Sequence, residues 1–426
     1  MKAKLRSLLI DNLLLRGSFV VLIGSTLANL GAYLYHLVMG RFLGPADYSI
    51  LESLISVLYY LGIPTAVFGV VVIKYISGEK DFFKVGQFIT KIFKKVIFWG
   101  FLGFTLFLLS FPFLKNLLRI NSFLLFFGIG LSAYISIFVT LFSSSLQGAM
   151  KFKDLSIFNT FSSWLKLFLS ILLLYLGFKV YGAIAGLVLS SLLAGIFGFF
   201  LIKKYVKLFA SDQISIKGSF SNIKPYFMAV FFTNLSLISF FTVDIILARY
   251  FLPPVMAGYY ASLSVLGKVI FFASSPISAV MFPMVSSKYT AGEDYRKLFW
   301  LSFLIILTIS LIITFIYFSF PELMISLLFG KEYLAAASNL GLFAIFLTLY
   351  SLCSIFLSFY LSISQIKAIY LSSFFALLQV VLIYFNHGSI AEIVKVNILT
   401  LSLLLAGLVL FYICKIPKIC SSKLCN

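Results

Sequence analysis

The sequence predicts an all-α polytopic membrane protein with about twelve membrane-spanning helices, arranged as two six-helix bundles. Three observations lead to this prediction: the composition, the length of the apolar runs and an internal repeat. Of the 426 residues, 62% are hydrophobic and only 11% are charged, whereas a soluble domain carries about a quarter charged residues. The composition therefore favours a chain that is surrounded by lipid.

Apolar runs recur along the chain at the length that a spanning helix requires, which is about 18 residues or more. We predict spans at 17–40, 49–76, 96–114, 121–146, 155–176, 181–202, 226–250, 256–285, 298–320, 334–363, 368–386 and 396–414. Two basic segments, 80–95 and 206–225, have an amphipathic character. They are predicted to lie on the membrane surface, the second as a cytoplasmic connector between the halves.

The positive charge is distributed unevenly over the predicted loops. The chain holds 33 Lys and Arg against 13 Asp and Glu, a net charge of +20. If the N-terminus is cytoplasmic, 24 of the 33 basic residues lie on the inside, seven on the outside and two within helices. This asymmetry predicts a protein of the cytoplasmic membrane with both termini in the cytoplasm. It also accounts for the basic charge without a nucleic-acid partner.

An internal repeat relates the two halves of the sequence. Pairs of like residues recur in the same order: Arg41 and Arg249 are 208 residues apart, Pro64 and Pro276 are 212 apart, Lys74 and Lys288 are 214 apart, and Gln147 and Gln365 are 218 apart. Each half holds six spans, so both halves enter the membrane from the same side, and the repeats are parallel. We therefore predict an N-terminal bundle at 1–205, the connector at 206–225 and a C-terminal bundle at 226–426.

The sequence offers no recognisable catalytic machinery. It lacks the GxxxxGK[ST] motif of phosphate-binding loops. Its two histidines, His36 and His387, and its four cysteines are not spaced as a metal site would require. No predicted outside loop is long enough to fold as a domain of its own. We predict that the protein is not an enzyme and that it has no metal or cofactor.

Two lysines fall near the middle of predicted spans. Lys166 and Lys268 each lie about 16 Å into a helix, close to the centre of a hydrocarbon core about 30 Å thick. A charged group there costs about 2.5–3.5 kcal/mol on insertion scales, and snorkelling to water is hardest from this depth. One lysine belongs to each half. We predict that both face the transport path and bind an anionic substrate; bonding to a neighbouring helix is the alternative.

Four further residues occupy matching positions in the repeat. His36 and Asp244 each lie five residues before an arginine, Arg41 or Arg249. The arginines are secondary candidates for substrate binding, or anchors at the membrane interface. Asp244 and His36 are candidates for coupling to H⁺ or Na⁺; a structural pairing of Asp244 with Lys268 or Arg249, and ordinary packing of His36, are the alternatives. Glu52 is expected to be solvated near the interface, which would leave the N-terminal half without a buried acid.

Two stretches carry a resemblance to a known family. The stretch GRFLGPADYS (40–49), its repeat ARYFLPPVMAGYYASL (248–263) and the twelve spans resemble the polysaccharide flippases of the multidrug/oligosaccharidyl-lipid/polysaccharide exporter superfamily. The resemblance implies two bundles around a central, cationic cavity. It also implies translocation of a polyprenyl-diphosphate-linked oligosaccharide across the cytoplasmic membrane by alternating access. Lys166 and Lys268 suit that cavity by depth and charge.

Other functions remain as alternatives. A cation-coupled multidrug or metabolite antiporter of the same superfamily would need buried acids converging in one bundle, and Asp244 is the only well-placed candidate. A membrane enzyme acting on lipid-linked sugars would need a long outside loop with catalytic residues. A lipid scramblase or scaffold is a third alternative. The expected partners are the lipid-linked glycan, membrane lipid and a coupling ion, H⁺ or Na⁺; the oligomeric state is left open.

Overall fold

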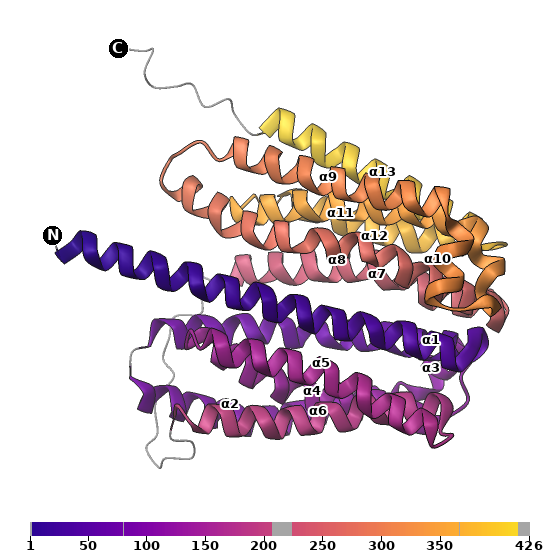
Figure 1. Ribbon diagram of the computed structural model, residues 1–426, viewed down its shortest axis with the longest axis horizontal. Coiled ribbons are helices and arrows are strands. Elements are labelled where there is room, and N and C mark those ends of the chain that lie inside the picture. The colour runs from indigo at the N-terminus through magenta and orange to yellow at the C-terminus, as the bar shows by residue number, and fades with distance from the viewer. Residues whose placement is uncertain (1, 80, 207–223, 366, 416–426) are drawn as a thin grey trace. The chain divides into compact units, whose positions relative to one another are not determined.

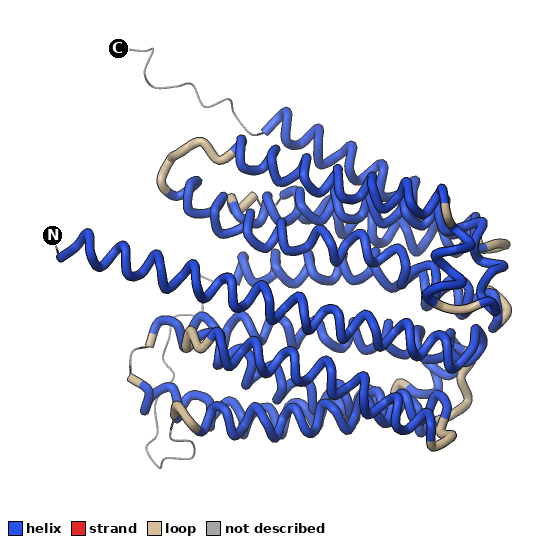
Figure 2. The backbone as a smooth tube through the Cα atoms, in the orientation of Figure 1, coloured by secondary structure: helices blue, strands red, loops and turns tan. Residues whose placement is uncertain are grey.

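A computed structural model describes residues 2–79, 81–206, 224–365 and 367–415, and almost all of this part of the chain is helical (Figures 1 and 2). No strand occurs among these residues. Eleven of the helices are long and apolar enough to span a membrane. They carry the twelve predicted spans because the first two lie on one kinked helix. The prediction of an all-α membrane protein is confirmed.

The helices group into two compact units, 1–220 and 221–426. The helices of unit 1 are α1 (Lys2–Gly78), α2 (Phe82–Leu109), α3 (Phe111–Leu118), α4 (Phe123–Gly148), α5 (Phe152–Tyr175) and α6 (Lys179–Lys203). Those of unit 2 are α7 (Lys224–Phe251), α8 (Pro254–Thr290), α9 (Arg296–Ser319), α10 (Pro321–Leu328), the 3₁₀ helix η2 (Lys331–Asn339), α11 (Leu340–Ser362), α12 (Lys367–Phe385) and α13 (Ile390–Lys415). Most of the predicted connector 206–225 lies outside the described residues.

A kink at Gly44 divides α1 into two segments. Gly44 has φ 72° and ψ 170°, a backbone conformation that is essentially restricted to glycine, and Pro45 follows it directly. The matching position in unit 2 is the break between α7 and α8, where Pro253 and Pro254 stand. Pro45 and Pro253 are 208 residues apart, the same offset as the paired arginines. The repeat seen in the sequence therefore reappears as the same backbone break in each unit.

A short helix follows the third span of each unit. The helices α3 and α10 have eight residues each and carry a proline in the first turn, Pro112 or Pro321, a position where the missing N–H of proline costs nothing. The fourth span, α4, follows α3 directly in unit 1, whereas in unit 2 the 3₁₀ helix η2 stands between α10 and α11. The two units therefore share not only the number of spans but also this irregular element.

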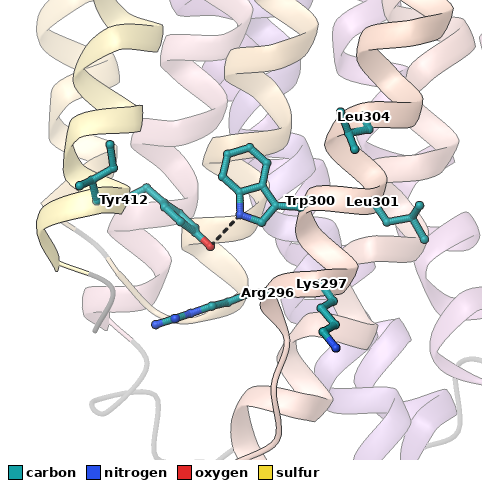
Figure 3. A pocket seen from close by; sticks show the side chains of 7 residues that line it. Arg296, Lys297, Trp300, Leu301, Leu304 and Tyr412 are labelled. Carbon is teal, nitrogen blue, oxygen red and sulfur yellow. Dashed lines mark hydrogen bonds between the residues drawn. The ribbon is translucent and has the colours of Figure 1, made fainter. Parts of the chain in front are cut away.

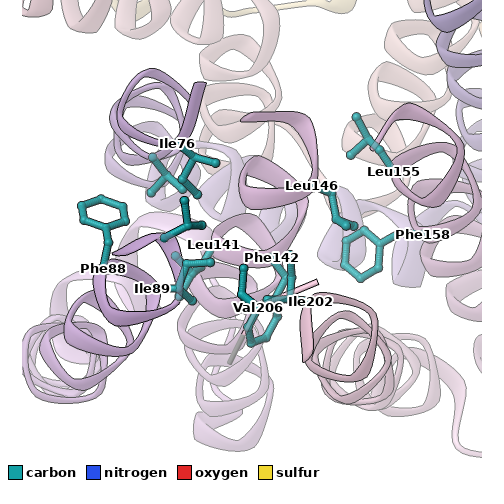
Figure 4. Close-up of a cluster of buried hydrophobic side chains, with 12 residues drawn as sticks. Ile76, Phe88, Ile89, Leu141, Phe142, Leu146, Leu155, Phe158, Ile202 and Val206 are labelled. Atoms are coloured by element: carbon teal, nitrogen blue, oxygen red, sulfur yellow. The ribbon is translucent and has the colours of Figure 1, made fainter. Parts of the chain in front are cut away.

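The core of unit 1 at one end of its bundle joins five helices. Apolar side chains from the end of α1, the start of α2, the end of α4, the start of α5 and the end of α6 pack there (Figure 4). The prediction that segment 80–95 lies on the membrane surface is wrong for most of its length. Val85, Phe88 and Ile89 are buried in this core, because their i, i+3, i+4 spacing places them on one face of α2.

Helix α11 is the central helix of unit 2. It packs against α8, α9 and α13, and its buried side chains occur on all sides, from Phe343 to Tyr360. Only a helix that is surrounded by other helices buries residues all round. The surrounding helices α7, α8, α12 and α13 are the ones that carry the polar residues described next.

Candidate functional site

Unit 1 buries a carboxylate beside the kink in α1. Glu52 is 1% exposed and lies two turns after Gly44. Its Oε1 accepts a hydrogen bond of 2.9 Å from the hydroxyl of Tyr48 and pairs with Nδ1 of His36. Tyr48 is one turn away on the same helix face, whereas His36 belongs to the segment before the kink. The expectation of a solvated Glu52 is wrong, because the kink brings the second segment of α1 beside the first.

Lys166 belongs to the same cluster. Its Nζ, from α5, lies 4.5 Å from the centroid of the Tyr35 ring, a cation–π contact. Tyr35 is fully buried, its hydroxyl donates a hydrogen bond of 3.4 Å to the carbonyl of Ala183, and its ring meets the ring of His36 edge-on at 5.4 Å. Glu52 is within electrostatic range of Lys166. The structure therefore brings Lys166 and His36, predicted separately, into one cluster around Glu52.

Unit 2 buries its own carboxylate in a network of neutral donors. Asp244, on α7, is fully buried, and its Oδ2 accepts hydrogen bonds from the Tyr260 hydroxyl at 2.6 Å and from Asn397 Nδ2 at 3.3 Å. Asn397 Nδ2 also donates to the Tyr260 oxygen at 3.0 Å, and Gln379 Nε2 donates to Asn397 Oδ1 at 2.9 Å. The backbone N–H of Ile245 binds Asp244 Oδ1 at 2.9 Å. Groups from α7, α8 and α13 thus meet at one carboxylate, and α12 joins the network through Asn397.

Lys268 is the cation of the unit 2 cluster. It lies on α8, is 5% exposed, and places its Nζ 4.2 Å from the centroid of the Phe241 ring. The charges of Lys268 and Asp244 attract each other within this cluster. Each unit therefore combines one buried carboxylate, one lysine and one aromatic ring beneath that lysine.

The two clusters stand at matching places in the repeat. His36 corresponds to Asp244 and Glu52 corresponds to Tyr260, because both pairs are 208 residues apart. Within each unit the two partners are 16 residues apart. The position of the acid differs, however: Glu52 of unit 1 follows the backbone break, whereas Asp244 of unit 2 precedes it. Each unit thus pairs a carboxylate with a partner 16 residues away on the other side of the backbone break, and the two units differ in which member is the carboxylate.

The two arginines differ from each other in environment. Arg41 is exposed, whereas Arg249 is 6% exposed. Each lies about 7.5 Å further along its helix than His36 or Asp244, by the rise of an α-helix. Matching positions in the sequence therefore do not give matching environments here.

Sequence reasoning missed the neutral and acidic partners of the predicted residues: Tyr48, Glu52, Tyr260, Gln379 and Asn397. A signal for two of them was present, since the offset of 208 maps Glu52 onto Tyr260 as it maps His36 onto Asp244. Gln379 and Asn397 had no comparable signal, because they reach Asp244 only through the packing of α12 and α13 in the folded unit.

Comparison with known proteins places the chain in a family. Residues 14–289 match the family of polysaccharide biosynthesis proteins. An uncharacterized membrane protein of Methanocaldococcus jannaschii is 26% identical over 294 residues, covering 64% of this chain and 68% of that protein. This relative is described as a membrane protein, and its description names no substrate.

Solved structures share the fold at low sequence identity. An inward-facing multidrug resistance transporter of the MATE family, in the MOP superfamily, matches with a TM-score of 0.76 and 16% identity, over 88% of this chain and 93% of that one. The lipid II flippase MurJ, in an inward closed conformation, matches with a TM-score of 0.69 and 14% identity, over 92% of this chain and 87% of that one. A MOP superfamily transporter from Pyrococcus furiosus, described as having a binding pocket of reverse polarity, matches with a TM-score of 0.61 and 18% identity, over 93% of this chain and 95% of that one.

These matches confirm the resemblance that the GRFLGPADYS stretch and the repeat indicated. The chain has the fold of membrane transporters and of a lipid flippase. The family match covers well over half of the 426 residues, and the chain therefore belongs to the polysaccharide biosynthesis protein family.

Proposed function

We propose that this protein is a flippase that moves a polyprenyl-diphosphate-linked oligosaccharide across the cytoplasmic membrane by alternating access. The observation that carries the proposal is the lysine held inside each unit, Lys166 over Tyr35 and Lys268 over Phe241, in a chain of the polysaccharide biosynthesis family. A diphosphate cannot cross about 30 Å of hydrocarbon unaided. Buried cations are the groups that stabilise it on the way.

The two lysines act as the primary substrate contacts in this proposal. Lys166 is partly exposed and Lys268 is buried, so Lys166 meets the diphosphate first, and Lys268 joins when α7 and α8 shift. Arg41 and Arg249, further along their helices, guide the headgroup near the end of the path. The N- and C-termini lie in the cytoplasm, as the distribution of basic residues favours.

Coupling to protons follows from the position of the acids. Glu52 and Asp244 compete with a substrate phosphate for the same lysines. A proton taken up at the His36–Glu52 pair or at Asp244 neutralises the carboxylate and leaves the lysine to the substrate. H⁺ fits the unit 1 pair better than Na⁺, because its partners are an imidazole nitrogen and a hydroxyl, whereas hard cations prefer several oxygen ligands. His36 and Asp244 are thus proposed as coupling residues, together with Glu52.

The test is transbilayer movement in proteoliposomes. A polyprenyl-diphosphate oligosaccharide is placed in one leaflet, and the access of an added lectin to its sugar is followed over time. We expect Lys166→Ala to slow movement more than Lys268→Ala, and the double variant to abolish it. The matched control is Lys94→Ala with Lys95→Ala, which removes two exposed lysines from α2. Movement that is equally fast in the folded double variant would refute the substrate role of the lysines.

A cation-coupled antiporter of the same superfamily is the second candidate. The buried Glu52 favours it more than the sequence did, since unit 1 does hold a buried acid. In this case the proteoliposomes would show no movement of the lipid-linked sugar with or without a pH gradient. Proton-dependent efflux of a small organic cation, lost in Glu52→Gln, would then establish the antiporter.

A further inference from the structure

A groove opens between α9 and α13 at one end of unit 2, away from the Asp244 cluster of that unit. Its volume is about 640 Å³, within the range of small-molecule sites, about 300–1,000 Å³. Its lining is drawn in Figure 3: Arg296, Lys297, Trp300, Leu301 and Leu304 come from α9, and Tyr412 and Ile413 from α13. The indole Nε1 of Trp300 donates a hydrogen bond of 3.2 Å to the hydroxyl of Tyr412, which ties the two walls together.

The charged end of the groove is positive. Arg296 and Lys297 stand in the first turn of α9, and none of the described residues that line the groove is a carboxylate. Of the two acids just before α9, Glu293 pairs with Lys288 at 3.5 Å, whereas Asp294 accepts the backbone N–H of Arg296 at 3.0 Å and so lies beside the groove. Two basic residues against this one neighbouring acid leave the end net positive, and an anion of another molecule complements that charge.

The remaining walls suit a hydrocarbon chain. Leu301 is 57% exposed, Leu304 is 55% exposed and Ile413 is 70% exposed, on helices that are long and apolar enough to span a membrane. Leu301 and Leu304 are one turn apart on α9 and so form a continuous apolar strip. Trp300 and Tyr412 lie between the basic residues and the apolar strip, the position that aromatic residues favour at membrane interfaces.

We propose that this groove binds one anionic phospholipid of the membrane. Its phosphate contacts Arg296 and Lys297, its glycerol region lies at Trp300 and Tyr412, and one acyl chain runs along Leu301 and Leu304. The bound lipid bridges α9 and α13. The proposal rests on the groove alone and is independent of the transported substrate.

The test measures lipid retention by the full-length protein in detergent, using native mass spectrometry. Phosphatidylglycerol is compared with phosphatidylcholine as the added probe. We expect one phosphatidylglycerol to be retained in preference to phosphatidylcholine, and Arg296→Gln with Lys297→Gln to weaken this retention by about 30-fold, from the contribution of each basic residue near an anionic surface. Lys94→Gln with Lys95→Gln removes the same charge from α2, which matches α9 in the repeat, and is expected to leave retention unchanged.

A third variant separates the groove from general surface charge. Trp300→Leu keeps both cations but removes the indole and its hydrogen bond, and we expect it to lower phosphatidylglycerol retention several-fold while the protein stays folded by circular dichroism. Equal losses in both double variants, or no loss in Trp300→Leu, would show diffuse attraction and overturn the proposal. Displacement of phosphatidylglycerol by an equimolar polyprenyl diphosphate would also overturn it, because the groove would then belong to the transported lipid.

Discussion

The two units have the same order of spanning helices, but the hydrogen-bond partners of their buried acids differ. In unit 1, Glu52 pairs with Nδ1 of His36 and accepts a hydrogen bond from the Tyr48 hydroxyl. In unit 2, Asp244 is surrounded by Tyr260, Asn397 and the backbone of Ile245, all neutral donors. At positions matched by the offset of 208, the acid stands after the backbone break in unit 1 and before it in unit 2.

The difference lies in the partners of the two carboxylates. The Glu52 carboxylate pairs with the imidazole of His36 and accepts from a tyrosine hydroxyl. The unit 2 carboxylate is held by three hydrogen bonds that need it as an acceptor, with Lys268 close by. We infer that the acid of unit 1 contributes more to the pH response of transport, and that the hydrogen-bond network around Asp244 contributes more to stability. Each prediction below alters one side of this comparison.

The largest effect is expected for Asp244→Ala. The change leaves Lys268 buried without its carboxylate and removes the acceptor of Tyr260 and Asn397. Breaking a buried ion pair by removing one partner costs about 3–5 kcal/mol. The measurement is unfolding of the detergent-solubilised protein by increasing SDS, followed by circular dichroism.

The double variant Asp244→Ala with Lys268→Ala tests the reason for that loss. Removing the orphaned cation should restore part of the stability, so that the two changes are less than additive. Strict additivity would mean that Lys268 and Asp244 do not stabilise each other, and the unit 2 cluster would then be a hydrogen-bond network alone.

A second prediction concerns Glu52→Gln, which keeps the shape of the side chain but removes its charge. We expect a loss of about 1.5–3 kcal/mol, the value of a hydrogen bond to a charged group, and transport that responds much less to a pH gradient. The measurement is the proteoliposome assay at several external pH values. Asp244→Asn is the matched variant: a pH response lost there, but kept in Glu52→Gln, would reverse the roles assigned to the two units.

The third prediction addresses the kink that brings Glu52 to His36. Gly44→Ala forces a Cβ into a conformation that costs about 1–3 kcal/mol for other residues. We expect this loss in the SDS unfolding assay. Gly62→Ala is the control on the same helix: nothing lies within 4 Å of the added carbon, and alanine is favoured over glycine inside a helix, so stability should hold or rise. Equal behaviour of the two variants would contradict a strained kink.

The sequence revealed the spans and the repeat because both depend on local quantities, the length of apolar runs and the spacing of like residues. It placed Lys166 and Lys268 correctly inside helices for the same reason. It failed where distant segments meet. Depth counted along the chain put Glu52 near the interface, but the kink at Gly44 turns that position into the bundle.

The same reasoning explains the error at the start of α2. Its lysines suggested a surface helix, yet one face carries Val85, Phe88 and Ile89 into the core. Packing decides whether the apolar face of a helix contacts lipid or other helices. The charges on the opposite face do not distinguish these two cases. The roles of Asn397 and Gln379 could not be predicted for a related reason: the role of a buried amide in a membrane helix depends on its hydrogen-bond partner, which only the folded unit shows.

The smallest effect is expected at the edge of the unit 2 network. Gln379 is fully buried and donates to Asn397, but its Oε1 has no hydrogen-bond partner in the part of the chain that the structure describes. Gln379→Leu removes one hydrogen bond, worth about 0.6 kcal/mol on average between membrane helices, and also removes the unsatisfied acceptor. We expect the free energy of unfolding to change by less than about 1 kcal/mol in either direction. A loss as large as that of Asp244→Ala would show that Gln379 orients Asn397 towards the Asp244 carboxylate. The stability of unit 2 would then depend on the whole hydrogen-bond network of Asp244, Tyr260, Asn397 and Gln379.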